Sequence, residues 1–231
     1  MPSPPAGGKM PPKKAFGQKY FYPFAVALRV VPMESQVLEW LKAGRDDAED
    51  IVDLPWSVKQ VGENHYVAEH PKMPFLLNVL FMDGFVRLVV TSGIETIAME
   101  LRDRVKTYHT LLVLNERMNM LKFTLSGMND EITLRVDLDE KSLGKEEFND
   151  ALTALLVGMN VLMDALGLTE VFQEAIFERL SMMIIERLQK GASEREIIDF
   201  LTRKVGMPES EARTLLSEIK KAMKGEDRGY F

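Results

Sequence analysis

Histidine is the side chain that most often serves as a metal ligand or an acid–base catalyst, and the sequence contains three. His65 and His70 each have a glutamate within two positions, and imidazole with carboxylate is a ligand set that binds metal ions. Their spacing argues against a shared ion, because side chains five positions apart in a strand point to opposite faces of the sheet. The absence of cysteine also excludes thiolate ligands, thiol catalysis and disulfides. We therefore expect no metal site.

Carboxylates in pairs could act as general acid and base. Glu131, Asp137 and Asp139 are close in sequence, but we expect them at exposed strand and loop positions rather than in a catalytic pair. The acidic residues between positions 46 and 53 lack the spacing and the glycine of an EF-hand loop, so we expect a solvated loop there. Nucleophile-elbow, P-loop and dinucleotide-binding motifs are also absent. We therefore expect no catalytic residues, no cofactor and no enzymatic activity.

Basic side chains near the C-terminal end could bind phosphate groups. Ser193 with Glu196 three residues later is a capping-box pattern, which predicts the start of a helix that ends at Gly206. A tight Gly206-Met207-Pro208 turn joins it to a second predicted helix, so residues 193–223 resemble a helix-turn-helix. The candidate phosphate contacts are Lys204, Arg213, Lys220 and Lys221. Glu209 and Glu211 argue against this hypothesis, because acids in the first turn of a recognition helix would repel DNA. We favour a docking or dimerisation hairpin, with nucleic-acid binding as the alternative.

Composition divides the chain into three parts. Residues 1–19 are a basic Pro/Gly-rich tail, which we expect to be disordered because it cannot bury enough apolar area. Residues 20–166 alternate predicted strands and helices, and within them residues 21–31 are a predicted strand or extended apolar arm. Residues 167–231 form a predicted helical extension. The net charge of −6 disfavours nucleic-acid binding through the whole surface, and no apolar run is long enough to span a membrane.

The middle part is predicted to contain three strand pairs and two long helices. Asp83-Gly84 between apolar runs is a strong hairpin signal, because both residue types tolerate positive φ. A long helix, capped by Thr91 or Ser92, should follow this hairpin. Its apolar residues recur at steps of three and four and are predicted to face the core: Ile94, Ile97, Leu101, Val105, Tyr108 and Leu112. Residues 121–125 and 131–137 alternate apolar with polar side chains, which predicts another hairpin.

The order of these elements is a short helix, three or four strands, a long helix, two strands and a helix. Its most distinctive run is Leu111-Leu112-Val113-Leu114-Asn115, Leu121-Lys122-Phe123, Glu131-Ile132-Thr133-Leu134-Arg135-Val136-Asp137, Glu146-Glu147-Phe148 and Ala151-Leu152. Over residues 33–166 this pattern resembles the YbjN-type family, whose fold is that of type III secretion chaperones. The resemblance implies an α+β domain with a five-stranded antiparallel sheet packed against helices, a homodimer and a protein-binding surface. It brings no catalytic motif.

The predicted helix of residues 145–166 is apolar around more of its circumference than one sheet can cover. Its second contact is either the all-helical C-terminal extension or a second protomer, and both interpretations stay open. The candidate protein-interface residues are Val157, Val161, Phe172, Ile176 and Met183. We therefore expect a cytoplasmic, non-enzymatic, chaperone- or adaptor-like protein that binds a protein partner. A nucleic-acid-associated regulator, using the C-terminal hairpin and the basic N-terminal arm, is the alternative function.

Overall fold

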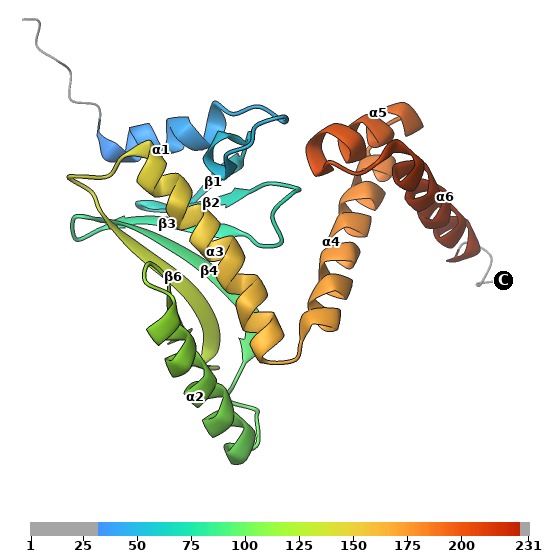
Figure 1. The fold of residues 1–231 in the computed structure, drawn as a ribbon. Helices are drawn as coiled ribbons and strands as arrows, with labels where there is room; N and C mark the ends of the chain where they lie inside the picture. The colour runs from blue at the N-terminus through green and yellow to red at the C-terminus, as the bar shows by residue number, and fades with distance from the viewer. Residues whose placement is uncertain (1–31, 227–231) are drawn as a thin grey trace, which may run out of the picture. The chain divides into compact units, whose positions relative to one another are not determined.

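The computed structural model describes residues 32–226, in which six strands form one antiparallel sheet (Figure 1). Across the sheet the strand order is β1-β2-β3-β4-β6-β5. The strands are β1 Ser57–Gly62, β2 His65–Glu69, β3 Leu77–Met82, β4 Phe85–Glu95, β5 Lys122–Ser126 and β6 Glu131–Asp139. The predicted tail of residues 1–19 and the predicted strand or arm of residues 21–31 lie outside the described residues.

The predicted α+β class with an antiparallel sheet is confirmed, but the count of five strands was wrong by one. β1 is an edge strand, and its side chains are exposed at every position except the half-buried Val58. The hairpin signals in the sequence allow three or four strands before the long helix, and the structure has four there; the count of five came from the family resemblance.

The Asp83-Gly84 turn fixes the register at the centre of the sheet. Both residues have positive φ, 54° and 77°, which is the conformation of a two-residue hairpin turn, and Met82 pairs directly with Phe85. Buried residues of β4 then follow at every second position, at Val86, Leu88 and Val90. This prediction is confirmed in both the turn and the strands that flank it.

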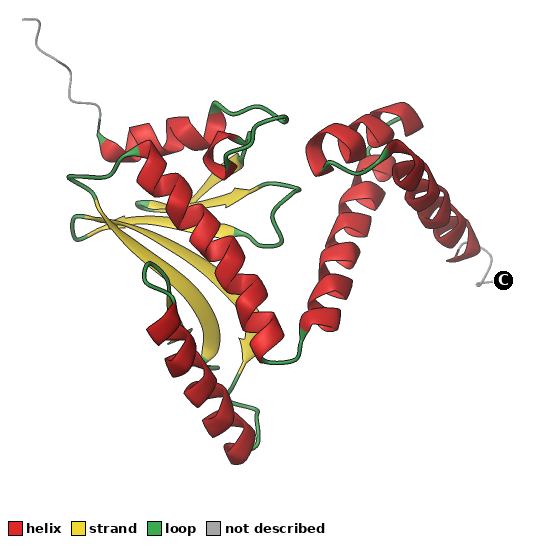
Figure 2. Ribbon diagram, viewed as in Figure 1, coloured by secondary structure: helices red, strands yellow, loops and turns green. Residues whose placement is uncertain are grey.

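Helices pack on the sheet and continue beyond it (Figure 2). They are α1 Met33–Lys42, η1 Ile51–Asp53, α2 Leu101–Arg117, α3 Lys145–Ala165, α4 Thr169–Gln189, α5 Glu194–Asp199, η2 Phe200–Val205 and α6 Glu209–Glu226. The main core lies between α3 and the sheet, where α3 packs on β4 and β6. Gly158 lets α3 pack tightly, since a β-carbon there would lie 2.0 Å from Leu121 Cδ2 and 3.3 Å from Leu134 Cδ2 on β6.

The start of α2 and the face that it buries differ from the prediction. β4 continues past Thr91 to Glu95, because a bulge at Gly93 (φ 75°) lets the strand resume its pairing with β6. α2 therefore begins only at Leu101, and it buries Thr107, Leu111 and Leu114. Four residues that were predicted to face the core are exposed instead: Ile97, Leu101, Val105 and Leu112. The reason is that α2 packs on β5 at the margin of the sheet and on α3, where one narrow side of the helix meets the core.

Helices α4 to α6 enclose a second apolar core, formed by Ile184, Ile197, Phe200, Leu201, Ala212, Leu215, Leu216 and Ile219. The predicted capping box at the start of α5 is confirmed: the Ser193 hydroxyl accepts from the Glu196 N–H, and the Glu196 carboxylate accepts from the Ser193 N–H. The single helix predicted after it is divided in two, because residues 200–205 form a π-helix that ends at Gly206 with φ 83°.

Candidate protein-binding surfaces

The outward side of α2 carries large apolar side chains that no other described element covers. Leu101 is 68% exposed, Val105 57% and Leu112 69%, and Ile97 lies exposed just before the helix. The helical positions follow one another at steps that keep them on one side of the helix, opposite the buried Leu111 and Leu114. These four side chains, Ile97, Leu101, Val105 and Leu112, form the α2 face.

Hydrogen bonds at the middle and near the end of α2 hold the α2 face outward. At the middle, the Tyr108 hydroxyl shares a hydrogen bond of 2.8 Å with the Thr96 hydroxyl, which also donates to Asp130 O at 3.0 Å. Near the end, Asn115 Oδ1 accepts from the Phe123 N–H at 2.7 Å, and Asn115 Nδ2 donates to Phe123 O at 3.1 Å. Because α2 is tied at these two points to residues at the ends of strands β4 and β6 and to β5, rotation of its exposed leucines into the core would break these bonds.

The five predicted interface residues are distributed over both cores rather than gathered on one surface. Val157 on α3 is exposed, whereas Val161 and Phe172 are half-buried against the main core. Met183 on α4 is half-buried against the second core. Ile176 is also half-buried and lies on α4 between Phe172 and Met183. The sequence left two possible second contacts for α3, the C-terminal extension and a second protomer. The C-terminal extension covers part of α3, because α4 contacts the main core through Phe172 near its start.

An exposed surface on α4 was missed by the sequence interpretation. Val171 is 60% exposed, Phe177 55% and Met182 64%. With Ala175, Ile185 and their neighbours, Met182 lines a groove of about 640 Å³ along this helix. The sequence did contain a signal for it, because α4 has apolar residues on nearly every side. The two cores cannot bury all of these sides, so some apolar residues must be exposed. Val171, Phe177 and Met182 form the α4 face.

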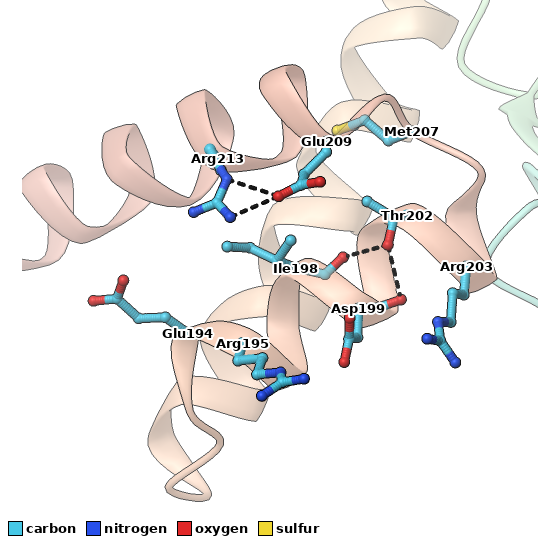
Figure 3. Close-up of a pocket in the computed structure, with 9 residues that line it drawn as sticks. All are labelled: Glu194, Arg195, Ile198, Asp199, Thr202, Arg203, Met207, Glu209 and Arg213. Atoms are coloured by element: carbon cyan, nitrogen blue, oxygen red, sulfur yellow. Dashed lines mark hydrogen bonds and ion pairs between the residues drawn. The ribbon is translucent and has the colours of Figure 1, made fainter.

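The helical hairpin of α5, η2 and α6 contains a groove of about 670 Å³ (Figure 3). The candidate phosphate contact Arg213 lines this groove, and it donates twice to Glu209 Oε1, at 3.0 and 2.6 Å. A second candidate, Lys220, is paired with Glu194, which also lines the groove. Lys204 is 3.5 Å from Asp46 of the α+β domain, and Lys221 is exposed. Three of these four cations are therefore already neutralised by acids of the same chain.

The two histidines singled out above lie in different surroundings. His65 Nε2 shares a hydrogen bond of 3.0 Å with Asn78 Oδ1, whereas His70 is buried and its Nδ1 accepts from the Lys72 N–H at 3.2 Å. Burial, assisted by the Lys72 ammonium, lowers the pKa of His70 to about 4, so the imidazole is neutral near pH 7. Within residues 32–226 no three potential ligands come together in a cluster that could hold a metal ion.

The three carboxylates considered for catalysis each have a partner. Asp137 lies 2.7 Å from Arg87 Nε and 2.8 Å from Arg135 Nη2, and hydrogen bonds from both outweigh the effect of burial, so its pKa is lowered. Glu131 accepts from the Gly93 N–H at 3.0 Å, and Asp139 accepts from the Ser142 hydroxyl at 2.9 Å. These contacts hold strands and turns in place. Separately, none of the described helices combines the length and the apolar character needed to cross a membrane.

Comparisons with known proteins place the chain in a family without assigning it a role. No curated protein matches the sequence. Residues 167–231 match a model that is labelled HTH_78 and described as a domain of unknown function. One similar structure is an uncharacterized protein from Methanothermobacter thermautotrophicus, with 15% identity, a TM-score of 0.42, and coverage of 58% of this chain and 96% of that chain.

Two further similar structures are chains of protein complexes. One is the heterodimeric ExoU-SpcU complex of the type III secretion system of Pseudomonas aeruginosa, with 15% identity, a TM-score of 0.34, and coverage of 48% of this chain and 81% of that chain. The other is the ExsC-ExsE complex, with 16% identity, a TM-score of 0.37, and coverage of 59% and 97%. Likenesses at this level assign no function to the chain. The family assignment comes from residues 36–166, by which the chain belongs to the family described as domain of unknown function DUF8183.

Proposed function

We propose that this chain is a non-enzymatic protein-binding protein, of the chaperone or adaptor type, that works as a homodimer in the cytoplasm. The observation that carries the proposal is the α2 face. An exposed cluster of large apolar side chains on a rigidly held helix is the kind of surface that a protein partner covers. A non-enzymatic role agrees with the ion-paired state of Asp137, and a chain without cysteine agrees with a reducing compartment.

The exposed area is large enough to matter for association. Complete burial of a leucine or valine side chain contributes about 1.5–3 kcal/mol, so the part still exposed at Leu101, Val105 and Leu112 is worth about 1–2 kcal/mol each. A two-fold contact would bury both copies, for a gross gain of roughly 6–12 kcal/mol, against an association cost of roughly 4–15 kcal/mol. The gain and the cost are of the same order, so we expect a dimer formed through the α2 face to depend on protein concentration.

A second copy is a suitable occupant because the α2 face complements itself. Leu101, Val105, Tyr108 and Leu112 follow at steps of four, three and four, which is the spacing of a helix–helix seam. Two such helices that meet around a two-fold axis place the same apolar residues opposite one another. The protein client would then use apolar surface that the dimer leaves open.

The homodimer is tested by a double substitution, Leu101→Asp with Leu112→Asp, and light scattering over a range of protein concentrations. Both side chains are exposed, so we expect a folded monomer, confirmed as folded by circular dichroism. Val61→Asp on β1 is the matched control, since Val61 is also exposed but lies outside the α2 face, and this variant should dimerise like the wild type. A wild-type chain that stays monomeric at the highest concentration would remove the homodimer. Unchanged dimerisation of the double variant would exclude the α2 face as the interface.

A further inference from the structure

Three glutamates form a continuous acidic row on α4. Glu170, Glu174 and Glu178 are exposed and follow one another at steps of four, so they lie on the same side of the helix. Like charges at this spacing destabilise a helix, and the row contains two such pairs. The helix therefore carries a small electrostatic cost that a cationic partner would relieve.

Basic residues of the same helix are engaged elsewhere. Arg179 donates to Met73 O at 3.0 Å and lies 3.7 Å from Glu69. Arg187 stacks over the Phe200 ring at 3.9 Å, and Lys190 is paired with Glu186. Within the described part of the chain, no ion pair engages the three glutamates of the row.

Exposed apolar side chains lie on both sides of this acidic row. By helical periodicity Val171 and Met182 lie along one side of it, and Phe177 lies along the other. On the side of Met182, the groove of about 640 Å³ gives an apolar side chain a place to bind. Charge and shape together thus require a partner that presents cations in a row with large apolar groups beside them.

We propose that the α4 face and its acidic row bind a cationic amphipathic segment of a partner protein. This inference rests on the proposed protein-binding function and names the chemistry of the client. Lysine or arginine side chains of the segment meet Glu170, Glu174 and Glu178, and its apolar side chains cover Val171, Phe177 and Met182. The acidic row would repel nucleic acid and anionic membranes, so neither is the occupant.

Binding is tested on the full chain with a fluorescently labelled helical peptide of leucine and lysine, about 14 residues long, and a matched peptide of leucine and glutamate. Fluorescence anisotropy should show that the lysine peptide binds and the glutamate peptide does not. Glu174→Lys with Glu178→Lys should weaken binding by about tenfold or more, because it reverses the charge of two contacts. Met182→Asp should weaken it as well, through loss of the apolar contact.

The control is Glu211→Lys with Glu218→Lys on α6, which changes the net charge equally at two exposed positions away from α4. It should change the affinity less than about twofold, since exposed charges farther apart than about 10 Å are screened at 0.1 M salt. Equal weakening by the two pairs of substitutions, or binding of the glutamate peptide, would overturn the proposal. Light scattering separates this test from the homodimer: the α4 variants should still dimerise, and the α2-face double variant should still bind the lysine peptide.

Discussion

Asn115 holds the end of α2 to the outer edge of β5, and its replacement by alanine should loosen the helix that carries the α2 face. The side chain makes two hydrogen bonds to one residue, accepting from the Phe123 N–H at 2.7 Å and donating to Phe123 O at 3.1 Å. Each bond contributes about 0.5–1.5 kcal/mol net, and the edge position of β5 lets water replace part of what is lost. We therefore expect Asn115→Ala to lower the free energy of unfolding by about 2 kcal/mol.

Urea unfolding followed by circular dichroism measures this loss. The control on the same helix is Thr110→Ala, because Thr110 is only half-buried and its hydroxyl bonds to Lys106 O within α2; its effect should stay below about 0.5 kcal/mol. Hydrogen exchange should also accelerate along α2 in the Asn115 variant, since the helix loses its tie to the sheet. A loss below about 0.5 kcal/mol with unchanged exchange would refute the view that Asn115 fixes α2.

Two further predictions concern pH and DNA. The pKa of His70 is lowered to about 4 in the folded chain, whereas a histidine in the unfolded chain titrates near 6.5. As the pH drops from about 6.5 towards 4, the unfolded chain therefore binds a proton that the folded chain does not, and stability should fall. The free energy of unfolding, measured by urea titration, should be about 2–3 kcal/mol lower at pH 4.5 than at pH 7. The same loss in the His70→Asn variant would contradict the assignment to His70. Duplex DNA should not bind at about 50 mM salt, because Lys204, Arg213 and Lys220 are ion-paired; anisotropy that reveals binding with a steep salt dependence would favour the nucleic-acid-associated regulator instead.

Local signals in the sequence predicted the local structure well. Asp83-Gly84 marked a hairpin because few other residue pairs adopt that turn, and Ser193 with Glu196 marked a helix start because both capping bonds form within four residues. The end of β4 could not be predicted in the same way. Its extension to Glu95 depends on pairing with a strand that comes about forty residues later in the chain, so nothing near Thr91 indicates it.

The exposure of the candidate surfaces could not be predicted from the sequence, for a different reason. The periodicity of α2 correctly grouped Leu101, Val105 and Leu112 on one side of a helix, but it could not say whether that side meets the core or solvent. That outcome depends on where the helix lies relative to the sheet. In the C-terminal hairpin, likewise, the sequence showed the cations but not the partner of Lys220, which is an acid of the preceding helix.

The two apolar cores differ in the distance along the chain that their contacts span. In the second core, Ile184 to Ile219 come together through neighbouring helices, whereas the sheet must join β4 to β6 across the whole of α2 and β5. Contacts that are near in sequence form faster, because less loop entropy is lost in closing them. We therefore expect the second core to form early in folding, and the pairing of β4 with β6 to come later. Until those two strands pair, α3 lacks the surface that it packs on in the fold, so its apolar circumference stays open to contacts with other chains.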